Sequence, residues 1–424
     1  MRYEFFQRKV IIIVSGFSSG KYLPLLFNGL GYACIHVTES RHLENGPWIT
    51  HLDMKCYDQL FILDTEEEMK NILEKWSGRV VCIIAGSELG ISLTDRLNKL
   101  FGLVGNDTSL SLSRRNKYIM HKTLKDHGIA YAKQILSDKI DNILNFFRGS
   151  TGKIVLKPPA AANTECVFYC TDEEQIIKNF SYIIGKYNYI NELNEAVLAQ
   201  EYIDGTQYIV NAISSNGVHH ITDIWQEVRE SDNLPSNDQY ADLLDQNTDT
   251  FEKLRAYIVS VLDVLGVRTG PSHSEVRIRE NGIPCLIETA SRLAGGIDMS
   301  IMHRVSGVSS LSLIPDAFLY PERFIETIKL PYFKKINYIR HVYLFSPIEG
   351  EIKCDPNINA FLEIDSFVSG FFRFKKGDFL PKTNRAFLKP RPGSIYLMND
   401  SKNELEKDYE RVRTLEMQLY RNIL

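Results

Sequence analysis

Continuous hydrophobic runs alternate with helical patterns over roughly the first 110 residues. Apolar runs at 10–14, 33–37 and 80–86 are typical of buried parallel strands, since both faces of such a strand are covered. A helical pattern follows the first run, from about Tyr22 to Leu30, and another follows the third run. Strands that alternate with helices predict a small, doubly wound parallel sheet.

The hydrophobic pattern changes from Asn116 onward. Residues 116–129 carry apolar side chains at helical spacing, and residues 153–170 predict two strands joined by a loop of small residues. Residues 198–226 predict two or three antiparallel strands, because turn dipeptides interrupt an alternating pattern. Those dipeptides are Asp204-Gly205 and Asn216-Gly217.

The remaining chain adds two helices and more strands. Residues 251–265 place their apolar side chains on one face, which is typical of an amphipathic helix packed on a core. Strand-like segments run through 338–397, and a charged helix follows from about Glu404. We interpret its mixed-sign face as a solvated surface. The fold class is therefore predicted to be α/β and α+β, with a parallel N-terminal sheet followed by antiparallel sheets.

The stretch from His273 to Gly296 carries the clearest candidate chemistry. Glu275 and Glu288 lie in two alternating runs joined by Asn281-Gly282, which predicts a hairpin with both carboxylates on one face. Arg292 follows closely. Two carboxylates and a guanidinium suit a site for magnesium and phosphate transfer. A surface ion pair on an ordinary hairpin fits these residues equally well.

Length and charge limit the class of protein. A chain of 424 residues is too long for one core and predicts roughly three domains. Its net charge of -4 gives no overall attraction to nucleic acid or to an acidic membrane. Its seven cysteines are scattered without the spacing of a zinc site, so we interpret them as reduced thiols.

No stretch approaches the roughly 20 apolar residues of a membrane span. The basic residues before the run at 10–14 superficially resemble a signal peptide, but that run is short and leads into a strand-turn-helix pattern. We therefore predict a cytoplasmic location. The loop at 15–21 resembles a phosphate-binding P-loop, yet Gly16 and Gly20 enclose three residues rather than four, and Tyr22 follows Lys21. A tight turn explains it better.

Taken in order, five separated motifs over roughly residues 80–325 resemble the ATP-grasp ligases. The chain is most similar to the L-amino acid ligase type, which joins an amino acid carboxylate to an amine. The resemblance implies four parts. These are an N-terminal Rossmann-like domain (1–110), a small lid subdomain (111–199), a central catalytic subdomain (200–329) and a C-terminal subdomain (330–424).

The resemblance implies an ATP site. Lys117 and Lys157 match the two lysines that contact ATP phosphates, although an ion pair with a neighbouring Glu also explains Lys157. The loop 160–166 matches the glycine-rich flap but carries alanines, which predicts a stiffer flap. The adenine-binding hinge and the ribose contact would be formed by Glu201, Tyr202, Ile203 and Gln207, where the family often has Glu in place of Gln207.

The resemblance also implies a metal site. Glu275 and Glu288 match the magnesium carboxylates, with Glu288 bridging two ions, and Mn²⁺ is expected to substitute. Many ATP-grasp enzymes add an Asn where this chain has Ala290, so one metal has fewer ligands. Arg292 matches the arginine that steadies the acyl phosphate and its oxyanion. Glu288 and Arg292 are therefore the predicted catalytic residues.

The implied function is ATP-dependent formation of an amide or peptide bond through an acyl phosphate. Small molecules, an amino acid carboxylate and an amine, are the expected partners, with no nucleic acid, no membrane and a possible homodimer. The predicted substrate residues are His273, Gly295 and Gly296, and further pocket candidates are His219, His220 and Asp223. Two alternatives stay open: an ATP-grasp enzyme with another acceptor such as bicarbonate, and a nucleotide-binding protein without catalysis.

Overall fold

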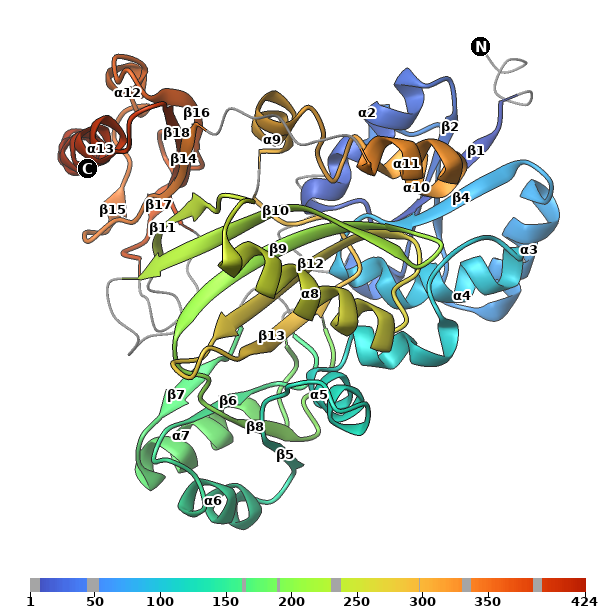
Figure 1. The fold of residues 1–424 in the computed structure, drawn as a ribbon, viewed down its shortest axis with the longest axis horizontal. Helices are drawn as coiled ribbons and strands as arrows, with labels where there is room; N and C mark the ends of the chain where they lie inside the picture. The colour runs from blue at the N-terminus through green and yellow to red at the C-terminus, as the bar shows by residue number, and fades with distance from the viewer. Residues whose placement is uncertain are drawn as a thin grey trace.

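The computed structural model describes most of the chain. The strands of the described residues form four sheets, and helices pack against them (Figure 1). The N-terminal sheet and the C-terminal strands lie at opposite ends of a long central sheet, and a smaller sheet lies below it in the view of Figure 1. The described residues are 8–43, 53–161, 165–188, 191–229, 238–296, 298–329, 337–383 and 391–424.

The N-terminal domain is a parallel sheet with strand order β3-β2-β1-β4. Every residue of β1 and β2 is buried, which confirms the predicted doubly wound arrangement. One strand was missed, because β3 is only half-buried and its apolar pattern is weak. The elements are β1 (Val10–Val14), α2 (Tyr22–Gly29), β2 (Ala33–Thr38), β3 (Gln59–Ile62), α3 (Glu66–Trp76), β4 (Val80–Ala85) and α4 (Ile91–Phe101).

The glycines of the loop after β1 allow close backbone approach. A Cβ added to Gly20 would lie 2.3 Å from the carbonyl oxygen of Gly86, in the loop after β4. The amide of Gly16 donates a hydrogen bond to Nε2 of His36. Gly20 thus allows close approach of two loops and Gly16 contacts strand β2, in agreement with a tight turn.

The second sheet is antiparallel, with strand order β5-β8-β6-β7, and we call residues 134–201 the lid. Two helices cover one face and share an apolar core with it. A further helix, α5 (Lys117–Asp126), precedes the lid; Met120 and Leu124 join the core under α8 (Asp249–Val264). The lid elements are β5 (Gln134–Ser137), α6 (Ile140–Arg148), β6 (Ile154–Lys157), β7 (Phe168–Cys170), α7 (Glu173–Ile183) and β8 (Val197–Glu201).

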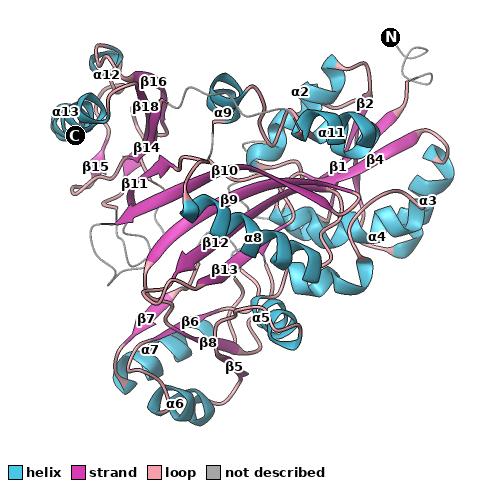
Figure 2. Cartoon of the chain, in the orientation of Figure 1, coloured by secondary structure: helices cyan, strands magenta, loops and turns pink. Residues whose placement is uncertain are grey.

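The central sheet has eight strands in the order β13-β12-β9-β10-β11-β14-β18-β16. Helix α8 covers one face, as Figure 2 shows, and Thr248 caps it by accepting a hydrogen bond from the amide of Phe251. The opposite face carries the polar side chains of the site described below. The strands before the C-terminal region are β9 (Thr206–Ser215), β10 (Val218–Arg229), β11 (Asp238–Leu243), β12 (Gly270–Ile278) and β13 (Pro284–Ala290).

The C-terminal strands extend the central sheet through the pairing of β11 with β14. The C-terminal helix α13 (Lys402–Ile423) buries one face against these strands and exposes the other, as its charge pattern predicts. The other elements are α9 (Met299–Ser306), α10 (Ile314–Leu319), α11 (Pro321–Ile328), β14 (Tyr338–Tyr343), β15 (Gly350–Glu351), α12 (Asn359–Leu362), β16 (Phe367–Phe372), β17 (Phe379–Leu380) and β18 (Gly393–Asn399). Short 3-10 helices are Ser18–Lys21, Ser40–His42, Met54–Cys56, Glu88–Gly90 and Thr108–Arg114.

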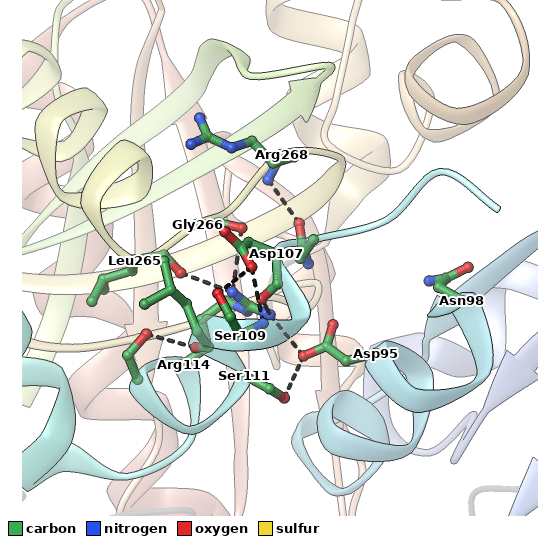
Figure 3. A network of polar contacts seen from close by, with 12 residues as sticks. Asp95, Asn98, Asp107, Ser109, Ser111, Arg114, Leu265, Gly266 and Arg268 are labelled. Carbon is green, nitrogen blue, oxygen red and sulfur yellow. Dashed lines mark hydrogen bonds and ion pairs between the residues drawn. The ribbon is translucent and has the colours of Figure 1, made fainter. Parts of the chain in front are cut away.

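A buried arginine joins the N-terminal domain to the central sheet (Figure 3). Nη2 of Arg114 donates to Oδ2 of Asp95 on α4 at 2.7 Å, and Nη1 donates to the carbonyl of Leu265 after α8 at 2.8 Å. Because Arg114 is 1% exposed, its charge must be compensated locally, and Asp95 does so. This network fixes the domain that carries Glu88 against the sheet that carries Arg292.

No helix in the described part of the chain is long and apolar enough to cross a membrane.

Candidate active site

A cleft with about 890 Å³ of empty space, part of it open to solvent, lies between the lid and the central sheet. A cleft between two subdomains is a common place for a small-molecule site. Lid residues and central-sheet residues line its two walls. Among them are Lys157, Tyr169 and Glu201 from the lid, and Gln207, Glu275 and Glu288 from the central sheet.

The hairpin β12-β13 places Glu275 directly opposite Glu288, as the alternating sequence pattern predicted. Burial raises the pKa of Glu275, and the negative charge of Glu288 raises it further. Two facing, half-buried carboxylates repel each other and are the donors that a hard divalent cation prefers. This pair therefore fits magnesium. In the described residues, no group of three or more His, Cys, Asp or Glu side chains is arranged to hold a metal.

Two lysines from different elements converge on Glu288. Nζ of Lys117, at the start of α5, lies 2.8 Å from Oε2 of Glu288 and donates to the carbonyl of Ala161. Lys157 ends β6; burial, followed by the charge of Lys117, lowers its pKa to about 8. Burial raises the pKa of Glu288, but the positive charges around it outweigh this effect and lower the pKa overall. Two cations thus face one carboxylate, and this excess of positive charge suits the binding of an anionic phosphate.

The predicted hinge residues line the cleft, but their side chains already have partners. Glu201 accepts from Nη2 of Arg279 at 2.6 Å, which directs its carboxylate into an ion pair. Buried Arg277 donates through Nη1 to the hydroxyl of Tyr202 at 2.8 Å and to the carbonyl of Ile203 at 2.6 Å. The side chain of Arg277 therefore fixes the shape of the hinge, a role that sequence reasoning missed.

Gln207 lies on β9 between this hinge and the carboxylate pair. Its Oε1 accepts from Nε of Arg277 at 3.2 Å, and its Nε2 donates to Oε2 of Glu275 at 3.4 Å. The side-chain amide thereby links the hinge to the carboxylate pair. A ribose contact by Gln207 stays a prediction.

Arg292 lies just after β13, where it meets the N-terminal domain. Its Nη2 lies 3.2 Å from Oε2 of Glu88, and Nη1 of Arg115 lies 3.4 Å from the other oxygen of the same carboxylate. Glu88 and Arg115 were missed by the sequence analysis. Their signal is weak, because Glu88 starts a short 3-10 helix and Arg115 directly follows another, both far from the hairpin in sequence.

A row of polar side chains crosses three strands beside the carboxylate pair. Asp223 on β10 pairs with Asn211 on β9, which pairs in turn with His273 on β12. Nδ2 of Asn211 donates to Asp223 at 2.5 Å, and its Oδ1 lies 3.0 Å from Nδ1 of His273. Burial, followed by the charge of Arg292, lowers the pKa of His273 to about 3, so the ring is neutral.

The other histidine candidates on β10 lie elsewhere. His219 contacts Ser214 at 2.7 Å and Asp263 of α8 at 3.3 Å, on the face of the sheet that α8 covers. His220 is buried, and burial lowers its pKa to about 4.

A second charged cluster, also missed, completes the cleft wall. Nε of Arg229 lies 2.8 Å from Oδ1 of Asp238, and Nη2 of Arg391 lies 3.0 Å from the other oxygen of that carboxylate. Burial and the charge of Asp238 raise the pKa of Glu227. The alternation of Glu227 and Arg229 could have indicated a shared face, but their partners come from distant segments.

Comparison with known proteins places this geometry in a family. The family model of the ATP-grasp domain matches residues 151–300. Dapdiamide A synthase from Enterobacter agglomerans is 32% identical over 419 residues, which cover 97% of each chain. This chain belongs to the ATP-grasp ligases. Accordingly it is an ATP-dependent ligase that forms carbon-nitrogen bonds.

Solved ATP-grasp structures share the whole fold. An L-amino acid ligase from Bacillus licheniformis has a TM-score of 0.75 at 18% identity and covers 96% of this chain and 98% of its own. An N5-carboxyaminoimidazole synthase from Aspergillus clavatus, in complex with ADP and 5-aminoimidazole ribonucleotide, has a TM-score of 0.66 at 12% identity and covers 96% and 99%. These likenesses confirm the predicted parallel N-terminal domain and antiparallel sheets of an ATP-grasp ligase.

Two glycines follow the arginine of this ATP-grasp site. A Cβ on Gly295 would meet Oγ of Ser18 at 3.5 Å, which places this residue against the N-terminal domain. Gly296 has φ of +75°, a left-handed conformation that favours glycine, and its carbonyl accepts from the hydroxyl of Tyr396. Neither glycine lines the main cleft. The flap at 160–166 falls partly outside the described residues, because 162–164 are not among them.

Proposed function

We propose that this ligase activates a carboxylic acid as an acyl phosphate and transfers the acyl group to an amine. In this proposal an amino acid is the natural acyl donor. The proposal rests chiefly on one observation: the facing carboxylates Glu275 and Glu288 lie within reach of the cations of Lys117 and Lys157. Such a cluster binds a polyphosphate with a divalent cation and neutralises the charge that develops during phosphoryl transfer.

The residues of the chain divide this work. Lys117 and Lys157 bind ATP phosphates, and the hinge from Glu201 to Ile203, together with Gln207, binds the adenosine. Glu275 and Glu288 would hold magnesium, with phosphate oxygens completing its coordination. When bound, magnesium supplies electrostatic stabilisation of the phosphate oxygens.

Two bond exchanges make up the reaction. A carboxylate oxygen of the acid attacks the γ-phosphorus of ATP, and the bond from that phosphorus to ADP breaks. The amine nitrogen then attacks the acyl carbon, inorganic phosphate leaves, and the amine proton passes to solvent. Arg292 orients the acyl group and stabilises its oxyanion. The name of the relative Dapdiamide A synthase supports an amide product.

A hydroxamate screen tests the proposal. Proteinogenic amino acids and their N-acyl derivatives are incubated with the protein, ATP, magnesium chloride and hydroxylamine, and ADP and hydroxamate are measured. We expect ADP release that depends on one class of acid, with an equal amount of hydroxamate. ADP release that depends on bicarbonate, or no acid-dependent release, would contradict the proposal. Mass spectrometry with pooled amines then identifies the natural product, and sedimentation tests the predicted homodimer.

A further inference from the structure

In the polar row formed by Asp223, Asn211 and His273, the hydrogen-bond partners determine which atoms donate and which accept. Oδ1 of Asp223 lies 2.7 Å from Nε1 of Trp225, and an indole nitrogen can only donate. That carboxylate oxygen is therefore an acceptor. Because Nδ2 of Asn211 lies 2.5 Å from the same oxygen, the amide must direct its NH₂ group toward Asp223.

The orientation of Asn211 fixes the tautomer of His273. With NH₂ directed at Asp223, the carbonyl oxygen Oδ1 of Asn211 faces Nδ1 of His273 at 3.0 Å. A carbonyl oxygen only accepts, so Nδ1 carries the proton. A ring that carries its proton on Nδ1 alone presents a lone pair on Nε2. Asp223 is also held through Oδ2 by the hydroxyl of Thr222 at 2.8 Å, so this end of the row is anchored at both carboxylate oxygens.

The lone pair of Nε2 lies beside the facing carboxylates. Nε2 of His273 is 3.9 Å from Oε1 of Glu275, one of the two facing carboxylates. Across the hairpin His273 pairs with Ala290, whose methyl group packs with Ala85 and Ile91 of the N-terminal domain. The small Ala290 side chain contributes no polar partner for Nε2.

We propose that Nε2 of His273 is the hydrogen-bond acceptor for the N–H of the amine that attacks the acyl group, and that Asn211 and Asp223 are positioning residues that fix this acceptor. This assignment rests on the proposed acyl phosphate function. A neutral acceptor suits a nucleophile, because a carboxylate would favour the ammonium form, whose nitrogen has no lone pair to attack with. The hydrogen bond leaves the amine lone pair directed at the acyl carbon.

The kinetic experiment uses hydroxylamine as the amine and the acid found in the hydroxamate screen. In His273→Leu, which removes the acceptor, the KM for hydroxylamine should rise about 10-fold or more, as the loss of one hydrogen bond predicts. The KM values for ATP and acid should stay within about twofold. In His273→Gln, the amide oxygen supplies an acceptor and should restore most of the amine affinity. Exposed His127, just after the C-terminal end of α5, provides the matched control His127→Leu.

The positioning residues have a separate readout. In protein labelled with ¹⁵N-histidine, the signals absent from His273→Gln identify His273, and wild type should show the Nδ1–H tautomer. Asn211→Leu should mix the two tautomers and raise the KM for hydroxylamine while leaving that for ATP unchanged. An Nε2–H tautomer in the wild type would overturn the proposal. So would an effect of His273→Leu on the KM of the acid instead of the amine.

Failure of the underlying function is distinguishable. The transfer of an oxygen isotope between bridging and non-bridging positions of ATP, with acid and without amine, reports acyl phosphate formation. We expect this exchange in wild type and undiminished in His273→Leu. Exchange in wild type combined with an unchanged hydroxylamine KM in folded His273→Leu would overturn the role of His273 alone. Absence of exchange in wild type would overturn the acyl phosphate itself, and with it this inference.

Discussion

Arg292 and Glu88 form an ion pair that joins the hairpin of the central sheet to the N-terminal domain, with 3.2 Å between Nη2 and Oε2. Both side chains are mostly buried, at 17% and 15% exposure. The pair therefore holds the guanidinium in one orientation near the facing carboxylates, and catalysis by a fixed charge depends on such positioning.

Glu88→Gln should keep a hydrogen-bond acceptor but remove the charge that orients Arg292. We expect kcat to fall about 10-fold to 100-fold, because a small displacement of a reacting group has effects of that size. The KM for ATP should remain unchanged, since Glu88 lies outside the cleft walls. Steady-state kinetics measure both values, and an unaltered kcat would show that Arg292 does not depend on Glu88.

Glu288→Gln should abolish most phosphate transfer. The substitution removes one charge at nearly constant shape and leaves Lys117 without the carboxylate that lies 2.8 Å from its Nζ. We expect acid-dependent ADP release to fall about 100-fold to 1,000-fold, as when a key electrostatic group is removed. Glu280→Gln, on the exposed turn of the same hairpin, is the control. Near-normal turnover of Glu288→Gln would disprove the site assignment.

Lys157→Met should stabilise the protein without nucleotide and weaken ATP binding. Burial and Lys117 lower the pKa of Lys157 to about 8, so charging it opposes folding, by roughly 1 to 3 kcal/mol. The gain in stability of the variant over wild type should shrink above about pH 8, because Lys157 of the folded wild type then loses its proton. Calorimetry should show ATP affinity lower by about 1.5 to 3 kcal/mol. Lys117→Ala should also weaken ATP binding; unchanged affinity in both variants would make the lysines structural.

Gly295→Val tests whether the backbone beyond Arg292 borders the acyl-donor pocket. Gly295 has no left-handed φ, and its added Cβ would meet only Oγ of Ser18, so the variant should fold. Gly296→Trp is a poorer test, because its φ of +75° strains any side chain. In competition between alanine and a bulky amino acid as acyl donor, we expect a shift toward alanine. An unchanged product ratio in a folded variant would remove Gly295 from the pocket.

His121→Gln should reduce the loss of stability in acid. Nδ1 of His121 accepts from the amide of Ala132 and Nε2 donates to the carbonyl of Ile287, so the buried ring is neutral. Burial, followed by the charge of Lys157, lowers its pKa to about 3. Because the unfolded chain binds the proton first, stability is full above about pH 6.5 and falls toward about pH 3. At about pH 5 the neutral His121 ring lowers the free energy of unfolding of wild type by roughly 2 kcal/mol relative to neutral pH. Thermal melts of variant and wild type should resolve this difference.

The local sequence determined the elements whose pattern is strong. The alternation and the Asn281-Gly282 turn of the hairpin predicted that Glu275 faces Glu288, because strand periodicity fixes which side chains share a face. The buried runs of β1, β2 and β4 and the apolar stripe of α8 were equally clear. The half-buried strand β3 was missed because its pattern is weak.

Only the tertiary structure decided which distant groups meet. Periodicity says which face of a strand a side chain occupies, but not which strand lies beside it, so the row from Asp223 to His273 could not be derived. Glu88 meets Arg292 across 204 positions, and the C-terminal strands join the central sheet through β14. The physical reason is burial: a polar group removed from water must find a partner, and the packing of whole elements determines which partner is within reach.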